Sequence, residues 1–413
     1  MLTMRWPRFG PAMLLGFYII VGWQNPVSAQ QFSGLIQVNI VHGGDHTPWL
    51  DKGTGILAYQ DNAVHLQQGV LRVADRLSSS FSYDVSANLY QLGEQRLGIS
   101  QATIHYKPLS HRQVRFKARA GFFYPRLSLE NVDLGWLSPY TYTQSAINSW
   151  VGEELRIAGI EGSLFSSGRS RRSPLTWEVT AGAFKGNDTL GTVLSWRGFA
   201  MHDRQSLHND RVVFANYPTV VDPNGIFHPS YVEPFHELDS RVGYYLGAHL
   251  NYYHSSKVRY YFYDNQANPN VVNSQRLYAW RTKFHSLALS HDVTPNGRFI
   301  AQWLTGSSHM GQRFVYINFD AYYVIYSHKV GSHRFSARYD DFNVGEDDIF
   351  PDDPNNSDGQ AVTFAWRYTI DKNWQVGLEQ HFNRNSADIR STLGEQQRQN
   401  QQQTLAVAQY RWR

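Results

Sequence analysis

Cysteine is absent from the 413 residues of this chain. The absence excludes disulfide bonds, thiolate nucleophiles and thiolate metal ligands. Charge is also sparse, because charged residues make up 17% of the chain and 38 basic residues nearly balance 34 acidic ones. A generally basic surface for nucleic acid is thereby excluded, so we expect no nucleic-acid partner.

Long apolar runs are scarce as well. The run that stands out, residues 11–23 (PAMLLGFYIIVGW), follows two arginines and precedes a small-x-small pattern at residues 27–29. Its thirteen residues fall short of the roughly twenty that a spanning helix needs, and the three-part pattern is typical of an export signal. We therefore expect residues 1–29 to be a cleaved signal peptide and residues 30–413 to form the mature protein.

Strict alternation is the pattern that fills the rest of the chain. The stretch FSYDVSANLY, residues 81–90, places apolar side chains from Phe81 to Leu89 on one face and mostly polar ones from Ser82 to Tyr90 on the other. A period of two indicates a strand, and about nine to eleven residues is the length of a tilted strand that crosses an outer membrane. The mean hydropathy of -0.46 is compatible with this, since polar lumen residues offset apolar lipid-facing ones. The aromatic content of 15% is typical of the two girdles of such a barrel.

Sixteen segments alternate in this way. Short turns alternate with mostly longer loops between these segments. This is expected of a barrel with periplasmic turns, external loops and both termini in the periplasm. The fold class that follows is all-β, a transmembrane antiparallel barrel in the bacterial outer membrane. A further stretch, 190–199, is assigned to a long loop. The predicted strands are 31–41, 66–76, 80–90, 97–107, 112–123, 155–165, 174–185, 240–253, 257–264, 278–291, 296–306, 315–328, 332–342, 360–370, 373–384 and 403–413.

Two loops are unusually long, 124–154 and 186–239. Loops of this length are usually functional or disordered. The first is rich in aromatic residues and ends in TQSAINSWVGEE, a short helical pattern. We therefore expect loop 124–154 to fold into the lumen, pack on the inner wall and narrow the pore.

A family resemblance is carried by residues 66–165, in particular by GVLRVADRLSSSFSYDVSANLY and ISQATIHYKPLSHRQVRFKARAGFFYPRLSLEN. This part resembles the phosphate-selective porins of the O and P type. In that family a strand ending Gly-x-Phe-x-Pro leads through Leu-Glu into the constriction loop, a pattern matched here by Gly121, Phe123, Pro125, Leu129 and Glu130. The resemblance implies a sixteen-stranded channel and a homotrimer.

The last residues, TLAVAQYRWR, alternate again, with Tyr410 and Trp412 on one face. They are similar to the closing strand that the barrel insertion machinery recognises, although Arg413 follows the aromatic residue. Further expected partners are outer-membrane lipid, lipopolysaccharide and small hydrophilic solutes, with anions as a possible preference.

The candidate pore residues are mainly basic. Arg115, Lys117 and Arg119 alternate along one strand just before the constriction loop, so they are expected to line the lumen as a basic wall. Phe116, Ala118, Ala120 and Phe122 of the same strand are expected to face lipid. Like charges on alternate residues repel unless a ligand or facing acids neutralise them, and acids of loop 124–154 and its end are candidates for that role. The remaining candidates are Arg72, Arg126, Glu130, Asp133, Arg241, Arg259 and Arg338. The acids expected to face the lumen by alternation are Asp84, Glu178, Asp320, Asp340 and Glu379. Whether such charges set selectivity or only pair across strands is left open by the sequence.

Other chemistry has weaker support. A metal site at His42, Asp45 and His46 lacks a fixed geometry, and no serine and histidine are spaced as a catalytic pair. Loop aromatics such as Trp136, Tyr140, Tyr142 and Trp150 fit packing against the wall better than stacking on sugars. We therefore predict a non-enzymatic porin without cofactors, with a barrel hydrolase or a non-conducting structural barrel as alternatives.

Overall fold

In this computed structural model, residues 30–413 are described except 45, 61 and 351. The predicted signal peptide therefore lies outside the described residues, and so does Asp45 of the candidate metal site. Among the helices that the structure describes, none has the length and apolar character needed to cross a bilayer.

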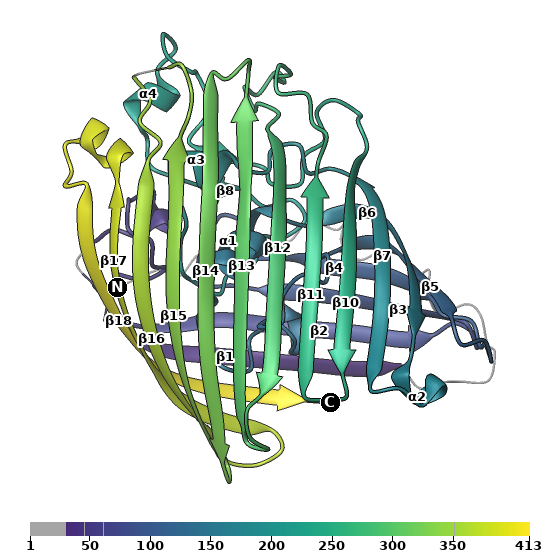
Figure 1. The fold of residues 1–413 in the computed structure, drawn as a ribbon. Helices are drawn as coiled ribbons and strands as arrows, with labels where there is room; N and C mark the ends of the chain where they lie inside the picture. The colour runs from purple at the N-terminus through teal and green to yellow at the C-terminus, as the bar shows by residue number, and fades with distance from the viewer. Residues whose placement is uncertain (1–29, 45, 61, 351) are drawn as a thin grey trace, which may run out of the picture.

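The described residues form a closed antiparallel barrel of sixteen strands (Figure 1). Each of the sixteen predicted segments is a barrel strand, and residues 190–199 lie in a loop. The barrel strands are β1 Gln31–His42, β2 Val64–Arg76, β3 Phe81–Leu89, β4 Leu97–Tyr106, β5 Arg115–Phe123, β6 Ile157–Ser166, β7 Leu175–Lys185, β10 Gly243–Tyr252, β11 Ser256–Asp264, β12 Arg281–Asp292, β13 Gly297–Met310, β14 Val315–Val330, β15 His333–Glu346, β16 Ser357–Thr369, β17 Trp374–Ala387 and β18 Arg398–Trp412.

The first and last strands pair with each other and so close the barrel. β1 pairs with β18 from Gly34 opposite Trp412 to His42 opposite Thr404, which confirms that the C-terminal segment closes the barrel. Short elements occupy the connections: β8 Val212–Val213, β9 Tyr231–Val232, α1 Ala146–Glu154, α2 Gly168–Arg171, α3 Thr192–Trp196, α4 Pro218–Val221, and the 3-10 helices η2 Trp49–Asp51, η3 Leu134–Trp136 and η4 Asp388–Leu393.

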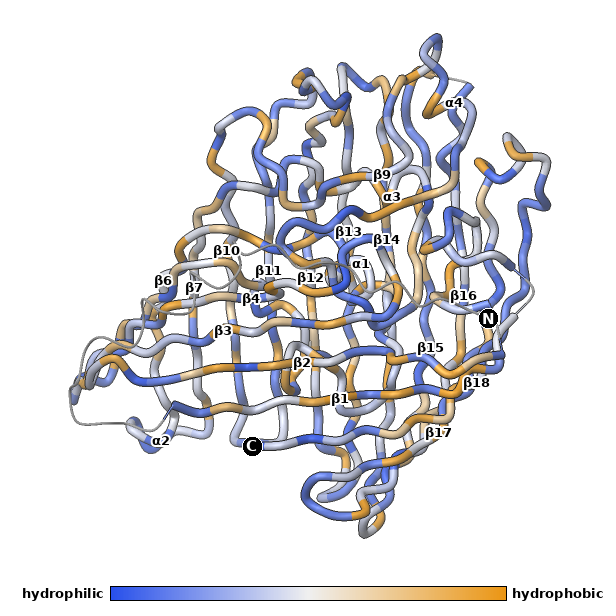
Figure 2. The backbone as a smooth tube through the Cα atoms, turned by 180° about the vertical axis from the view of Figure 1, so that it is seen from behind, coloured by the Kyte–Doolittle hydropathy of each residue, from blue (hydrophilic) through white to orange (hydrophobic). Residues whose placement is uncertain are grey.

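Hydrophobic and hydrophilic residues alternate along the strands (Figure 2), and this alternation separates an apolar outer belt from the lumen. On β3 the side chains of Phe81 and Leu89 are exposed on the outside, whereas Ser86 and Asn88 are buried inside. On β16 and β17, Phe364, Leu378 and Phe382 are exposed on the same outer face. An apolar exterior on a closed barrel is the arrangement of outer-membrane proteins.

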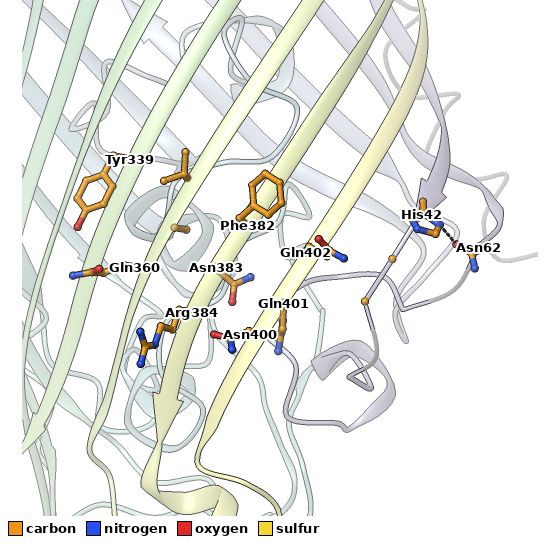
Figure 3. Close-up of a pocket in the computed structure, with 14 residues that line it drawn as sticks. His42, Asn62, Tyr339, Gln360, Phe382, Asn383, Arg384, Asn400, Gln401 and Gln402 are labelled. Atoms are coloured by element: carbon orange, nitrogen blue, oxygen red, sulfur yellow. Dashed lines mark hydrogen bonds between the residues drawn. The ribbon is translucent and has the colours of Figure 1, made fainter.

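Beyond the belt, on the side of the long loops, the polarity of the two faces of the wall is reversed: the inner face is apolar and the outer face is polar. Ile317 and Phe319 of β14 are buried inside, while Asn318 and Asp320 between them are exposed outside. The prediction that Asp320 faces the lumen is therefore wrong, and Asp320 instead accepts a hydrogen bond from Trp303 Nε1 on the outer face, at 2.8 Å. The outer wall at this level is polar, as Figure 3 shows for β16–β18.

The inversion has its cause inside the barrel. The connections 124–156 and 186–242 fold inward, and their apolar residues form a core with the inner wall of the long strands. Trp150 and Leu194 from these loops belong to the same cluster as Phe284, Phe319 and Phe342 of β12, β14 and β15. The upper lumen is thus packed largely as a protein interior, which explains why its wall is apolar.

Candidate pore and constriction

A glycine, Gly121, interrupts the regular alternation two residues before β5 ends and the constriction loop begins. Gly121 has φ +136°, a region that favours glycine, and a Cβ there would lie 2.1 Å from the carbonyl oxygen of Ala102. The alternation shifts at this point, so Phe122, expected toward lipid, is buried and packs edge-on against Phe235 of the long loop. The loop then ends in α1, whose N-terminus is capped by Ser145, and the predicted inward-folded loop with a helix is confirmed.

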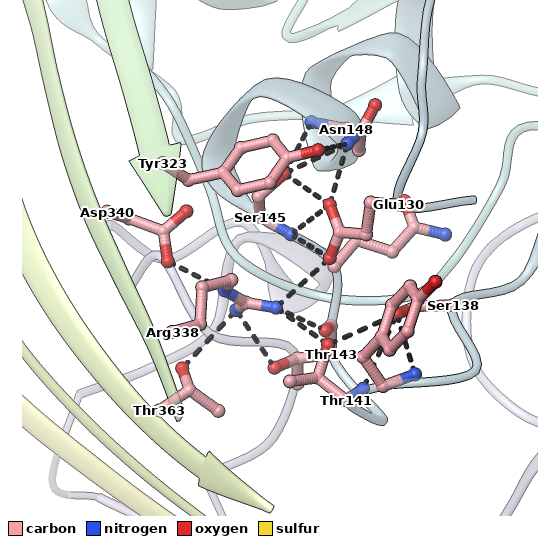
Figure 4. A network of polar contacts seen from close by, with 12 residues as sticks. Glu130, Ser138, Thr141, Thr143, Ser145, Asn148, Tyr323, Arg338, Asp340 and Thr363 are labelled. Carbon is pink, nitrogen blue, oxygen red and sulfur yellow. Dashed lines mark hydrogen bonds and ion pairs between the residues drawn. The ribbon is translucent and has the colours of Figure 1, made fainter. Parts of the chain in front are cut away.

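Glu130 and Arg338 hold this loop against β15 (Figure 4). The Glu130 carboxylate accepts hydrogen bonds from Ser145 Oγ and Asn148 Nδ2, both at 2.6 Å. It also lies 3.3 Å from the guanidinium of Arg338, which in turn contacts Asp340 at 2.7 Å. These ionic side chains are fully buried, so contacts within the protein replace water around them.

A second anchor comes from β17. The carboxylate of Glu379 accepts hydrogen bonds from the backbone N–H of Tyr142 at 2.5 Å and from the hydroxyl of Thr143 at 2.6 Å. Gly377 makes room for the tyrosine, since a Cβ there would lie 2.3 Å from Tyr142 Oη. Arg367 of β16 lies 4.0 Å from the centre of the Tyr142 ring. The loop is therefore bound to three consecutive strands, β15 to β17.

The loop aromatics are used for packing. Trp136 stacks on Tyr124 with ring centres 4.1 Å apart, and Trp150 is buried with its Nε1 donating to Glu154 at 2.7 Å. Tyr140 is also buried. This agrees with the packing interpretation.

The basic row on β5 lies on the lumen side, with partners that differ from those expected. Lys117 pairs with Glu178 of β7 at 2.7 Å, and Arg119 pairs with Glu161 of β6 at 2.8 Å. Arg115 instead lies over the ring of Phe165, at 4.7 Å.

Acids of the neighbouring strands therefore neutralise Lys117 and Arg119 but not Arg115, and the expected acids of the loop region are engaged elsewhere. Glu130 binds Arg338, Asp133 binds Arg411 at 2.5 Å, and Glu153 binds Arg197.

The other candidates are spread over the lumen and its rim. Arg72 pairs with Asp84, and Arg126 lies 3.6 Å from Glu178. Arg259 donates to the carbonyl oxygens of Arg126 and Ser128, at 3.0 and 2.5 Å, and so supports the start of the constriction loop.

Arg241 departs from its predicted position on a strand. β10 begins at Gly243, because the chain is still tied to the preceding loop at Arg241, whose backbone N–H donates to Asp239 at 2.8 Å. Its side chain is 54% exposed.

Four lumen-facing cations on the periplasmic half of the wall have no carboxylate within 4.0 Å among the described residues. All four lie within the first four residues of strands that start from short turns. They are Arg115 of β5, Lys257 and Arg259 of β11, and Arg334 of β15. Lys257 was missed by the sequence analysis, although its alternation with Arg259 and Tyr261 gave the signal.

The second long loop covers the constriction loop from the external side. Glu153 of α1 forms a bidentate pair with Arg197, at 2.8 and 2.5 Å, and lies 3.0 Å from His202 Nε2. The backbone N–H of Val193 in α3 donates to Glu154 at 3.0 Å. Acidic residues of the constriction loop thus bind the second long loop through ion pairs and hydrogen bonds.

Burial and charge move the pKa values of these loop acids in opposite directions. Burial by itself raises the pKa of Glu153, but Arg197 and His202 outweigh it and lower this pKa to about 2. Burial raises the pKa of Glu154 to about 7, since its partners are the neutral donors Val193 N–H and Trp150 Nε1. Burial likewise raises the pKa of Asp203 to about 7.

The same loop continues across the lumen to the opposite wall. Asp203 accepts hydrogen bonds from Gln67 and from Gln68 of β2, the latter at 3.0 Å. The guanidinium of Arg204 donates to the carbonyl oxygen of Gln95 at 2.9 Å. His208 donates from its backbone N–H to Ile99 of β4 at 3.0 Å. The connection between β7 and β10 therefore reaches the strands at the start of the barrel.

Comparison with known proteins supports the fold. No protein-family model matches the chain, and no curated protein matches it. Among solved structures, the outer membrane channel DcaP of Acinetobacter baumannii is 11% identical, with a TM-score of 0.55 over 93% of this chain and 97% of that one. In-vitro folded OmpT of Vibrio cholerae, in its trimer form, is 10% identical, with a TM-score of 0.53 over 93% and 99%. An anion-selective porin from Comamonas acidovorans is 10% identical, with a TM-score of 0.50 over 93% and 99%. The chain thus has the porin-like fold of bacterial outer-membrane barrels.

Proposed function

We propose that the chain forms an outer-membrane diffusion channel for small hydrophilic solutes, with a preference for anions. The observation that supports the proposal is the group of four lumen cations without a carboxylate partner, Arg115, Lys257, Arg259 and Arg334. Uncompensated charge of one sign in a narrow, water-filled passage raises the local concentration of the opposite ion. One of the solved structures with this fold is described as an anion-selective porin.

The proposal names small anions as a class rather than phosphate. The resemblance of residues 66–165 to phosphate-selective porins remains a prediction. The chain has eight lysines, spaced singly along the sequence, and most lumen arginines near the constriction already have carboxylate or carbonyl partners. A channel with this wall is expected to distinguish charge more than chemical identity.

The reversal potential in a planar bilayer under a KCl gradient tests this proposal. The refolded mature barrel is expected to prefer chloride, and the double variant R115Q/K257Q is expected to lose about half or more of that preference. Lys283→Gln is the matched control, because Lys283 is an exposed cation on the outer wall of β12. Cation preference in the unaltered protein, or equal effects of both changes, would contradict the proposal.

A second candidate function is a non-conducting barrel, and a specific observation favours it. The connections 124–156 and 186–242 share buried ion pairs and an apolar core within the upper lumen. A correctly folded barrel without conductance at any voltage would support this alternative. Folding is checked independently by the shift in gel migration between unheated and boiled samples.

The assembly that we propose is a homotrimer. The family resemblance implies it, and one structure with the same fold is a trimer form. Light scattering of the detergent-solubilised barrel distinguishes a trimer from a monomer.

A further inference from the structure

Two neighbouring turns at the periplasmic end of the barrel differ from the others in length. They are residues 107–114 between β4 and β5 and residues 167–174 between β6 and β7, and both are longer than the other turns at this end. The second turn contains α2, which Figure 1 shows below β7, at the end of the barrel away from the long loops. β5 pairs with β6, and the Ser166 hydroxyl donates to the carbonyl oxygen of Gln113 at 2.8 Å. The two turns therefore form one surface.

The charge on this surface has a single sign. Neither turn contains Asp or Glu, and the acids of β4 to β7, Glu161 and Glu178, are already paired with Arg119 and Lys117. Six cations of the two turns and of the first position of β5 have no carboxylate within 4.0 Å among the residues that the structure describes. They form the basic patch, Lys107, Arg112, Arg115, Arg169, Arg171 and Arg172.

The second turn presents its arginines from a backbone that is held in place. The Gly168 N–H donates to Thr176 Oγ1 at 2.8 Å, and the Ser173 N–H donates to the carbonyl oxygen of Gly168 at 2.9 Å. Arg169 and Arg172 are exposed. A ligand that binds here therefore orders side chains but little backbone, which reduces the entropic cost of binding.

The basic patch continues into the mouth of the barrel. Phe165 lies opposite Arg115 and Glu178 in the strand register, on the lumen side of β6. The Arg115 guanidinium lies 4.7 Å from the centre of the Phe165 ring, and Lys107 Nζ lies 5.9 Å from it. These two cations thus stand on the inner edge of the wall, out of reach of a lipid in the surrounding bilayer.

We propose that the basic patch binds an acidic segment of a periplasmic protein, an extended peptide rich in Asp and Glu. Its carboxylates pair with the arginines of the two turns, and one end of the segment reaches Arg115 and Lys107 in the mouth. Arginine presents a planar fork of donors that matches a carboxylate. Opposite charge also speeds the encounter of such partners and fixes their register. The interaction is independent of conduction.

The shape and charge of the basic patch favour a flexible peptide over other anionic occupants. Because the patch turns from the periplasmic surface into the lumen, a bilayer lipid would meet only its outer part. One small anion would leave most of the six cations without a partner. An isologous contact with a second copy of the chain would bring like charges together.

Fluorescence anisotropy of a labelled decaglutamate peptide, titrated with the refolded barrel in a non-ionic detergent, tests the proposal. We expect binding that weakens as the salt concentration rises. The variant R112Q/R169Q/R172Q is expected to weaken binding about tenfold, because three exposed ion pairs are lost. The matched control, K283Q/R384Q/R398Q, removes three exposed cations from the outer wall near the external end and is expected to bind as the unaltered protein does.

The variant K107Q/R115Q tests the part of the patch inside the mouth, and it is expected to weaken binding about threefold. Unchanged binding in this variant would show that the peptide stays outside the lumen and would overturn that part of the proposal. Equal loss in the matched control would indicate a diffuse charge effect and would overturn the patch as a site.

Competition identifies the occupant. Displacement of the peptide by short-chain phosphatidylglycerol or by soluble muropeptides, at the same concentration of negative charge, would assign the patch to lipid or to the cell wall and overturn the peptide. Gel migration before and after boiling shows that every variant is folded. Because anisotropy needs no conductance, failure of the proposed channel function leaves this test unchanged.

Discussion

Arg338 on β15 and Glu130 in the constriction loop are 208 residues apart in the sequence and form a buried ion pair across the lumen wall, at 3.3 Å. Arg338 also binds Asp340 and the carbonyl oxygen of Thr143. One guanidinium thus contacts two carboxylates and fixes the loop to the wall.

Replacing Arg338 with Ala is expected to release the constriction loop. Breaking a buried pair by removing one partner costs about 3–5 kcal/mol, because the remaining charge stays buried and uncompensated. Trypsin checks this, since Arg126 and Arg156 flank the loop and become cleavable when it leaves the wall. Arg334→Ala, on the same strand and face but only partly buried, is the control. If both variants resist trypsin equally, the pair does not hold the loop.

Arg119→Gln is expected to destabilise the barrel and to change ion selectivity little. The side chains of Arg119 and Glu161 are 8% and 2% exposed, so the change leaves a buried carboxylate without its cation. The free energy of unfolding in urea is expected to fall by roughly 3–5 kcal/mol. The double variant R119Q/E161Q is expected to recover most of that loss. A large change of reversal potential with unchanged stability would instead make Arg119 a selectivity residue.

The sequence allowed the strands to be predicted because a period of two survives wherever the two faces of a strand meet different surroundings. It also indicated an inward loop, since so many aromatic residues require a packing surface. It could not predict which acids meet which cations, because Glu161 and Glu178 approach Lys117 and Arg119 only through the strand register. Nor could it place Asp320, because above the belt the lumen side is the apolar one.

Loop packing is expected to weaken as the pH rises from about 5 to 8. Burial raises the pKa of both Glu154 and Asp203 to about 7, so between their ordinary values and pH 7 the packed loops hold more protons than the released loops. Stability therefore falls as the pH rises through this window, by about 1–3 kcal/mol for each group. Glu153 acts in the opposite sense, but its pKa of about 2 confines its effect to pH values below about 5.

Proteolysis of the loops at a series of pH values measures this dependence. The unaltered protein is expected to be cleaved faster at pH 8 than at pH 5.5, after correction for the activity of the protease on an unfolded substrate. The variant E154Q/D203N is expected to lose the dependence, because neither side chain then ionises. A steeper dependence in that variant would show that other groups control the loops.

A disulfide between the second long loop and the wall tests whether this loop moves during conduction. A Cβ at Gly98 of β4 would lie 3.1 Å from the Cβ of Leu207, close to the spacing of a disulfide, and the backbone of His208 is hydrogen-bonded to Ile99 beside it. Because the chain has no native cysteine, G98C/L207C introduces one defined pair. If the loop must leave the lumen for ions to pass, the oxidised variant is closed and reduction restores conductance to the level of the single variants. If oxidised and reduced barrels conduct equally, ions pass beside the packed loops, and the passage lies along the basic wall of β5 and β11.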